Sequence, residues 1–342
     1  MNRFSPQENG VTNSGSRLYH EKILIRLFAK GAPVSNISGC RILNKIYESS
    51  ISNIYRAVRG DEKEPVVLKM LKEDYPTPDK IVHYKQEYRI TRALDELSGV
   101  IRVYELEKHQ NGLVMILEDF GAKSLNILMG STNYSLEESL VIAIQVCVSL
   151  GEIHSANVIH KDINPSNIVM NPDSGQLKII DFGIATGLAH ENTLLVNPKI
   201  LDGTLAYMSP EQTGRMNRPI DYRSDYYSLG VTLFELFSGR LPFETNDPLE
   251  LVHCHIAKTP KPPHEFKSQI PEAISNIILK LLAKDAEARY QSTFGIKADL
   301  ESCLNQVRAN GKVKSFLLAR SDIPEKFEIP QHCMAATRKQ KV

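Results

Sequence analysis

Three polar residues close together in the sequence have the types and the spacing for phosphoryl transfer. Asp162 and Asn167 lie five residues apart, and Asp181 follows in the tetrapeptide Ile-Asp-Phe-Gly. Phosphoryl transfer asks a protein mainly for positioning and for stabilisation of charge. One carboxylate could orient an incoming hydroxyl group. The second carboxylate and the neutral oxygen of the asparagine amide could hold a magnesium ion against the phosphates.

Apolar runs flank these residues on both sides. Their composition indicates short buried strands, which would hold the polar groups on a rigid base. The runs are Val158–Ile159, Ile168–Met170 and Leu177–Ile180. An apolar-faced helix is predicted over Leu136–Ala156, with Ser135 as its N-cap and Glu138 as the capping-box partner. This helix leads directly into the loop that carries Asp162.

The loop sequence His160-Lys-Asp-Ile-Asn-Pro-Ser-Asn167, followed by Asp-Phe-Gly, resembles the catalytic and magnesium loops of the eukaryotic-type protein kinase superfamily. The residues of this loop are most similar to those of the N-terminal Ser/Thr kinase module of large bacterial multi-domain signalling proteins. In those proteins the kinase is followed by an ATPase-like region and sensor histidine kinase domains. The resemblance covers roughly residues 38–308.

The resemblance implies an α+β, two-lobed protein kinase fold, with a small β-rich N-lobe and a larger helical C-lobe. We expect an N-terminal extension over residues 1–37 and a kinase domain over residues 38–308. Within that domain, the N-lobe would cover residues 38–119 and the C-lobe residues 120–308. Residues 309–342 would form a C-terminal tail or linker remnant of the kind that leads to the ATPase-like region in the multi-domain relatives.

The resemblance also implies roles for five side chains. Asp162 would orient the substrate hydroxyl group and accept its proton, and Asn167 and Asp181 would bind magnesium. Lys69, in Val-Val-Leu-Lys, would contact the α- and β-phosphates, and Glu87 on the following predicted helix would pair with it. Taken alone, Lys69 also fits a surface lysine on an edge strand, and Glu87 also fits a solvated helix charge.

An ATP site is implied between the lobes. The residues expected to bind the nucleotide are Ile46, Ile54, Val67, Lys69, Glu118, Phe120 and Asn167. A strand predicted over Gly112–Leu117 would run into the hinge between the lobes. There the backbone groups of Glu118 and Phe120 would hydrogen-bond the adenine, so their side-chain types carry little signal.

The chain departs from the family in the turn that covers the phosphates. Strands are predicted over Arg41–Ile46 and Ile54–Val58, with the turn between them. The residues at the three usual glycine positions are Tyr47, Ser49 and Ser52. Side chains there limit the approach of the backbone to phosphate, although a serine hydroxyl could donate to a phosphate oxygen. We therefore expect modest affinity for ATP.

Two further departures flank the predicted catalytic aspartate. Lys161 replaces the family's arginine, so a point charge replaces a bidentate fork. Asn164 replaces the lysine that contacts the transferred phosphate in most Ser/Thr kinases, which removes one source of transition-state stabilisation.

Other kinase landmarks concern architecture rather than chemistry. Glu211, in Ser-Pro-Glu after the activation segment expected over residues 184–208, would pair with Arg289 in a buried ion pair. Asp225 would begin a buried central helix. His160 invites an acid–base role, but we expect it to pack under the phenylalanine of Asp-Phe-Gly.

Composition excludes several classes of protein. The chain has 342 residues, 42% of them hydrophobic, and a net charge of +1, so we expect no strong attraction to nucleic acid. The five scattered cysteines suit a reducing compartment better than a disulfide framework. We see no signal peptide and no run long enough to span a membrane, and we expect a cytoplasmic protein.

Taken together, the sequence predicts ATP- and magnesium-dependent phosphoryl transfer to Ser or Thr hydroxyl groups of protein substrates in signal transduction. Downstream ATPase or histidine kinase proteins are possible signalling partners. Two alternatives stay open. A pseudokinase-like regulatory module, with weak or no catalysis, would fit the missing glycines and Asn164. A small-molecule phosphotransferase is disfavoured by Ser209-Pro-Glu211 and Arg289.

Overall fold

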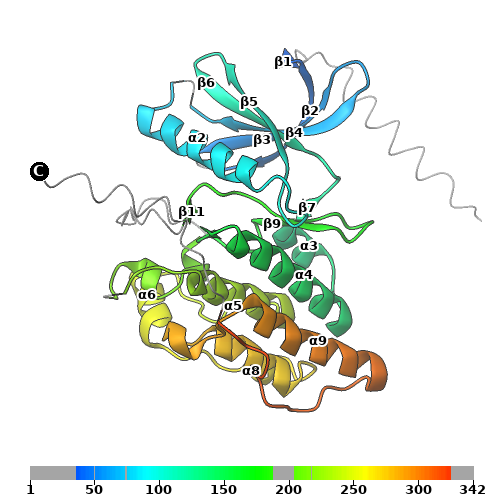
Figure 1. The fold of residues 1–342 in the computed structure, drawn as a ribbon, viewed down its shortest axis with the longest axis vertical. Coiled ribbons are helices and arrows are strands. Elements are labelled where there is room, and N and C mark those ends of the chain that lie inside the picture. Colours follow the sequence, from blue (N-terminus) through cyan, green and yellow to red (C-terminus); the bar gives the residue numbers. More distant parts are fainter. Residues whose placement is uncertain (1–35, 50, 74, 188–203, 217, 325–342) are drawn as a thin grey trace, which may run out of the picture.

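The computed structural model describes residues 36–49, 51–73, 75–187, 204–216 and 218–324. Most of the predicted N-terminal extension, part of the activation segment and the end of the predicted tail lie outside these ranges. The described residues form two lobes, with a sheet and one helix above and a helical region below (Figure 1). This arrangement confirms the predicted α+β kinase fold.

The small lobe is built on a six-stranded antiparallel sheet with the order β1-β2-β3-β4-β6-β5. The strands are β1 (Asn36–Ile37), β2 (Cys40–Glu48), β3 (Ser52–Arg59), β4 (Glu64–Leu71), β5 (Val103–His109) and β6 (Gly112–Glu118). Alternation of side chains gives the sheet two apolar faces. Ala57, Val66 and Leu68 pack on one face, and Val103 and Met115 pack on the other.

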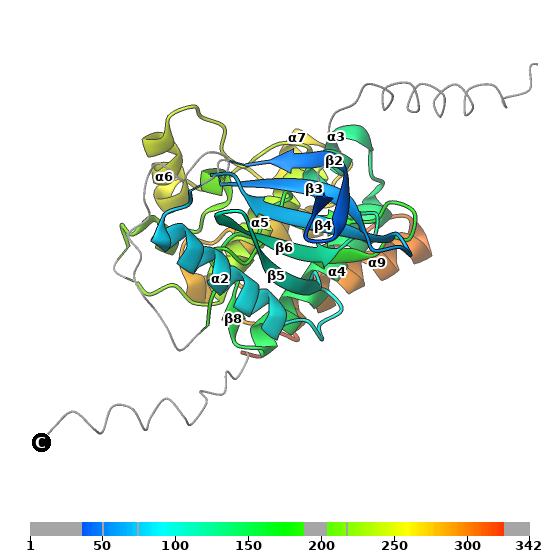
Figure 2. The ribbon, with the colours of Figure 1, turned by 90° about the horizontal axis from the view of Figure 1, so that it is seen from above.

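Helix α2 (Pro78–Ala93) covers the second face of the sheet and runs alongside its strands (Figure 2). A proline in its first turn follows Thr77, and Asp79 lies near the positive helix N-terminus. Helical spacing in the sequence predicts a helix over Asp79–Leu97, but the helix ends at Ala93. The N–H of Leu94 closes the last turn, and the Leu94 side chain is buried in the core of the large lobe. The sheet-facing side of α2 carries Glu87 toward the strands.

The large lobe is mainly helical. Its helices are α3 (Leu125–Ser131), α4 (Leu136–Ser155), α5 (Arg223–Ser238), α6 (Pro248–Ala257), α7 (Pro263–Phe266), α8 (Glu272–Leu281) and α9 (Thr293–Asn310). Helix α5 is buried on all sides, as expected for a central core helix. The predicted capping box of α4 is present, because Ser135 and Glu138 each accept the other's backbone N–H.

Short strands frame the loops between the lobes. They are β7 (Lys123–Ser124), β8 (Val158–Ile159), β9 (Ile168–Met170), β10 (Leu177–Ile179) and β11 (Thr186–Gly187). Strands β10, β9 and β7 form one small sheet, and β11 pairs with β8. The three apolar runs predicted as strands therefore contain strands: β8 lies immediately before the loop that carries Asp162, β9 lies immediately after it, and β10 pairs with β9.

The described chain includes residues 309–324 of the predicted C-terminal tail. Helix α9 continues to Asn310, and Gly311 ends it in the left-handed conformation at φ +66°. The segment that follows then packs on the large lobe through Phe316 and Leu318. The carboxylate of Asp322 accepts hydrogen bonds from the Gln291 N–H and the Ser292 hydroxyl, both at 2.8 Å. We call residues 311–324 the C-terminal strap.

In the part of the chain that the structure describes, no helix is both long and apolar enough to cross a lipid bilayer.

Candidate active site

The loop between β8 and β9 is held from below by Asp225, in the first turn of α5. One carboxylate oxygen accepts the His160 backbone N–H at 2.9 Å, and the other accepts the Lys161 N–H at 2.7 Å. His154 of α4 lies 2.9 Å from the same carboxylate. Burial raises the pKa of Asp225, but these contacts lower the pKa by more than burial raises it. The net shift is downward, so the carboxylate stays ionised. This anchor lets Lys161 adopt φ +67°, an unfavourable conformation for a residue with a side chain.

Asp162 accepts hydrogen bonds from two side-chain amides. Asn167 Nδ2 lies 2.8 Å from one carboxylate oxygen, and Asn164 Nδ2 lies 2.9 Å from the other. Both amides also donate to the Asp162 carbonyl oxygen. Burial raises the pKa of Asp162 to about 6, and the two asparagine hydrogen bonds offset part of that rise. A carboxylate in this range is basic enough to accept a proton near neutral pH.

His160 has a structural position, as expected. Its ring packs edge-on against Phe182, with the ring centroids 4.8 Å apart. One ring nitrogen lies 3.1 Å from the Ile180 carbonyl oxygen, and the other accepts the Asp162 N–H at 3.2 Å. These contacts fix the neutral tautomer that carries its hydrogen on Nε2. The histidine therefore connects the Asp162 loop to the segment that carries Asp181.

Lys69, Glu87 and Asp181 come together between the lobes. Lys69 Nζ lies 2.6 Å from Glu87 Oε1 and 3.2 Å from Asp181 Oδ1. Burial lowers the pKa of Lys69, but the two carboxylates raise the pKa by more than burial lowers it. The net shift is upward, so the side chain stays protonated. Burial raises the pKa of Glu87 to about 7 even though Lys69 lowers it. The lysine is held in place with one N–H donor left over for a ligand.

The side chain of Asp181 lies beside Lys69 and is 43% exposed. Its backbone has φ +67°, and its carboxylate accepts the Gly183 N–H at 3.3 Å. Burial raises the pKa of Asp181, but the charge of Lys69 lowers the pKa by more than burial raises it. The carboxyl group is therefore more acidic than usual. Asn167 uses its Nδ2 on Asp162, which leaves its amide oxygen for another partner. An amide oxygen and an ionised carboxylate are suitable magnesium ligands.

The predicted nucleotide residues lie on the strands above this site. The register pairs Ile54 with Lys69, and it pairs Val67 with Leu117 at the end of β6. Directly paired residues face the same side of a sheet, so the aliphatic side chains and the lysine share one face. Ile46, on β2, is 39% exposed and lies at an irregularity in the pairing of β2 with β3. These residues fit an apolar ceiling for a base.

The hinge is fixed by contacts that sequence reasoning did not find. Arg56 of β3 forms an ion pair with Asp119, with Nε and Oδ2 2.6 Å apart. The carboxylate of Glu118 accepts a hydrogen bond from the Arg102 backbone N–H at 2.7 Å, and it forms an ion pair with Lys178. The only signal for these pairs in the sequence is opposite charge, and many other charged residues share it.

The backbone of the hinge is partly engaged within the protein. The Glu118 N–H donates to the Arg102 carbonyl oxygen at 3.1 Å, and Asn171 Nδ2 donates to the Phe120 carbonyl oxygen. An adenine ring could therefore use the Glu118 carbonyl oxygen and the Phe120 N–H.

The predicted Glu211–Arg289 pair is present and fully buried. The guanidinium group meets both carboxylate oxygens, at 2.6 and 2.9 Å. Its other N–H groups donate to the carbonyl oxygens of Ala283, Arg223 and Lys284. Next to Glu211, the Gln212 amide donates to the Lys161 carbonyl oxygen at 2.7 Å, which ties this segment to the catalytic loop. No motif in the sequence indicates this contact of Gln212.

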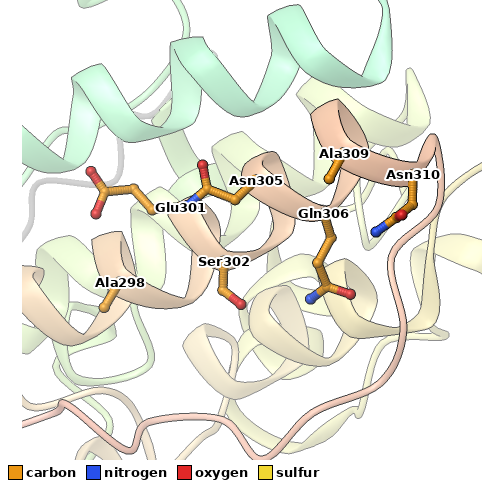
Figure 3. Close-up of a pocket in the computed structure, with 7 residues that line it drawn as sticks. All are labelled: Ala298, Glu301, Ser302, Asn305, Gln306, Ala309 and Asn310. Carbon is orange, nitrogen blue, oxygen red and sulfur yellow. The ribbon is translucent and has the colours of Figure 1, made fainter.

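A shallow hollow lies along one side of α9 in the large lobe. Figure 3 shows its lining, which consists of Ala298, Glu301, Ser302, Asn305, Gln306, Ala309 and Asn310. Its single carboxylate, Glu301, pairs with Lys297 at 3.1 Å. The hollow belongs to a different part of the lobe from Asp162 and Asp181.

Comparison with known proteins agrees with this geometry. The family described as protein kinase domain matches residues 41–300. A probable serine/threonine-protein kinase of Corynebacterium efficiens is 32% identical over 278 residues, which cover 78% of this chain and 41% of that protein. The serine/threonine-protein kinase PrkC of Bacillus subtilis is 28% identical over 277 residues, covering 80% of this chain and 41% of PrkC. PknB of Mycobacterium leprae is 31% identical over 241 residues, covering 69% of this chain and 38% of PknB.

The chain thus spans about two fifths of the length of these curated relatives. The family match covers both lobes and every residue of the candidate site. The chain therefore belongs to the protein kinase domain family.

Proposed function

We propose that this protein transfers the γ-phosphoryl group of ATP to Ser or Thr hydroxyl groups of protein substrates. The observation that carries the proposal is the connected set of charges between the lobes. Lys69 contacts both Glu87 and Asp181, and Asp162 is oriented by the amide of Asn167. These residues supply the groups that phosphoryl transfer requires.

Asp162 is proposed as the residue that orients the substrate hydroxyl group and accepts its proton. Each carboxylate oxygen already accepts one amide N–H, so its plane is fixed and a lone pair on each oxygen is left for the substrate. Because burial raises its pKa to about 6, the group is ionised at neutral pH and still basic enough to accept a proton as the new bond forms.

Magnesium and ATP are the proposed cofactors, and the residues present fit both. Asp181 and Asn167 would hold the metal, which would neutralise charge on the phosphates when bound. Lys69 would position the phosphates with its remaining N–H donor, and Glu87 keeps the lysine from turning away. Ile46, Ile54 and Val67 would cover the base, while the backbone groups of Glu118 and Phe120 would orient it.

A transfer assay tests this proposal directly. Purified protein, radiolabelled ATP, magnesium and a generic protein substrate are compared with Asp162→Asn, which keeps the shape of the side chain and removes its basic oxygen. We expect label on serine or threonine with the wild type and a loss of at least about a hundredfold with the variant. Equal transfer by both proteins would refute the role of Asp162, and no transfer by the wild type would refute the activity.

A regulatory module without transferase activity is the second candidate. It is favoured by Asn164, which stands where a lysine would assist the transferred phosphate, and by the absence of glycine at positions 47, 49 and 52. Binding of MgATP without any transfer in the same assay would support this candidate over the first.

We also propose a wider context for the domain. Similarity of the catalytic-loop sequence to multi-domain bacterial proteins supports a cytoplasmic signalling role beside ATPase or histidine kinase partners. Packing of the C-terminal strap supports a kinase unit that extends to residue 324, with the lobes dividing near residue 119. Cell fractionation, and affinity capture with Asp162→Asn as a trap, would test the compartment and the partners.

A further inference from the structure

The turn between β2 and β3 closes on itself through one side chain. Ser49 Oγ accepts the Ile51 N–H at 3.1 Å and the Ser52 N–H at 2.8 Å. The Ser49 N–H donates to the Ser52 carbonyl oxygen at 2.8 Å. A hydroxyl group that serves two backbone amides acts as a local cap, of the kind that serine forms in turns. The turn is therefore fixed without glycine.

The capped amides lie where a protein kinase uses backbone N–H groups on phosphate. In this family the loop between the first two strands of the nucleotide site covers the phosphates. Here the register carries β3 from Ser52 past Ile54, which pairs with Lys69. The amides of Ile51 and Ser52 are thus at the tip of the hairpin whose stem lies beside the phosphate-binding lysine. A phosphate that approaches this tip meets amides that already have an acceptor.

The charges beside the turn are also paired internally. Glu48, adjacent to Ser49, accepts ion pairs from both Lys45 and Lys72. The Lys72 backbone N–H donates to the Ile51 carbonyl oxygen at 2.8 Å, so this lysine is fixed next to the turn. Both of these lysines near the hairpin tip therefore face a carboxylate of the protein.

We propose that Ser49 competes with the phosphates of ATP for the backbone amides of Ile51 and Ser52, and thereby limits nucleotide affinity. The inference rests on the proposed ATP-dependent function and names the residue that tunes it. Binding of a phosphate to these amides requires the Ser49 hydroxyl group to rotate away. A glycine at this position has no hydroxyl group, so the same amides would be free to receive phosphate oxygens.

This geometry also changes the expectation that the serines donate to phosphate. Ser49 Oγ lies 3.2 Å from both the carbonyl oxygen and the hydroxyl group of Ser52, so its single hydrogen is directed into the turn. Ser52 is only 6% exposed. In this conformation neither hydroxyl group is directed outward as a phosphate ligand.

Calorimetric titration of MgATP into Ser49→Ala tests the proposal, because alanine removes the hydroxyl group without adding the flexibility of glycine. One net hydrogen bond corresponds to roughly a fivefold change in affinity, so we expect the Kd to fall about fivefold or more. Ser49→Thr keeps the hydroxyl group and should bind within about twofold of the wild type. Ser155→Ala removes a serine on α4 that bonds the Gly151 carbonyl oxygen, far from the turn, and is the remote control.

Amide hydrogen exchange gives a second measurement on the same variants. Without nucleotide, Ile51 and Ser52 should exchange faster in Ser49→Ala than in the wild type, and MgATP should restore their protection. A Kd that is unchanged or higher in Ser49→Ala, or equal exchange rates at the two amides, would overturn the proposal. If the wild type binds MgATP and transfers phosphate but Ser49→Ala binds no better, only the competition is refuted. If none of the proteins binds MgATP, the proposed function and the competition both fail.

Discussion

The catalytic loop and the phosphate-covering turn are both short polar segments, but they are held in opposite ways. The catalytic loop depends on distant buried groups, above all Asp225, which is 64 or 65 residues away from its backbone partners. The side-chain hydrogen bonds of the turn at Ser49 go to neighbours within three residues, and one backbone bond, from the Lys72 N–H to the Ile51 carbonyl oxygen, ties the turn to the end of β4. A loop held by the core keeps its geometry whatever binds there. A turn held by its own hydroxyl group exchanges that hydrogen bond when a better ligand arrives.

From this contrast we expect substitutions around the catalytic loop to have large effects on transfer. Substitutions in the turn at Ser49 should change nucleotide affinity only moderately. The following predictions test it from the largest effect to the smallest.

Asp181→Asn should reduce phosphoryl transfer by more than about a hundredfold, because it removes the charge that faces magnesium while keeping the shape of the side chain. The variant loses the ion pair between Asp181 and Lys69, but Glu87 still pairs with Lys69, so the melting temperature should change by no more than a few degrees. Transfer assays and thermal melts on the same preparation separate the two effects. Turnover equal to that of the wild type would contradict the metal assignment.

Arg289→Ala should destabilise the fold by about 3–5 kcal/mol, because it leaves the buried Glu211 carboxylate without a cation. The pair is almost completely inaccessible to solvent. Arg308→Ala is the matched control, since Arg308 pairs with Glu137 at 2.7 Å but about half of each side chain is exposed. That control should cost less than about 1 kcal/mol. Denaturant unfolding measures both, and similar losses for the two variants would count against a core-held lower lobe.

The pH profile of transfer should fall on the acid side near pH 6. Asp162 must be ionised to accept a proton, and burial raises its pKa to about 6, so kcat/KM should decline as the pH drops through that value. Because the Asn164 hydrogen bond lowers this pKa, Asn164→Ala should move the acid limb to higher pH. Rate measurements between about pH 5 and pH 8 check both statements. An acid limb that does not move would remove Asn164 from the control of Asp162.

The sequence is sufficient to predict a contact or an element where a recognisable motif or a local apolar pattern specifies it. The resemblance to protein kinases implies that Arg289 pairs with Glu211, and the structure contains this buried pair. The same resemblance implies that His160 packs against Phe182, and the two rings are in contact. Individual strands and helices are predictable because alternating and helical apolar patterns are local properties of the chain. The division into two lobes follows from the resemblance to protein kinases.

The sequence is insufficient where the direction of a side chain decides the outcome. By type alone Asn164 is a missing lysine, but its amide donates to Asp162. By type alone Ser49 is a possible phosphate donor, but its hydroxyl group faces its own turn. Arg56 and Asp119 are separated by 63 residues, and only the folded sheet brings them together. Rotamers and long-range partners are set by the tertiary structure, and residue types alone do not encode them one by one.

The C-terminal strap is held partly by distant residues and partly by packing at the surface of the large lobe. Its substitution gives the smallest predicted effect, a loss of stability. Asp322 is half-buried and holds the strap to the start of α9 through two hydrogen bonds, from Gln291 N–H and the Ser292 hydroxyl group. Ser292 is also the N-cap of α9, and its Oγ accepts the Gly295 N–H at 3.0 Å. Asp322→Ala removes the acceptor that orients this cap, so we expect a loss of about 1–2 kcal/mol in the free energy of unfolding.

Asp173→Ala changes an exposed carboxylate in the turn between β9 and β10 and should cost less than about 0.5 kcal/mol. Transfer activity at room temperature should be unchanged in both variants, because neither residue contacts the candidate site. If Asp322→Ala is as stable as Asp173→Ala, the strap lies on the lobe without stabilising it, and the kinase unit ends with α9. If it is less stable and equally active, the strap stabilises the large lobe without taking part in transfer.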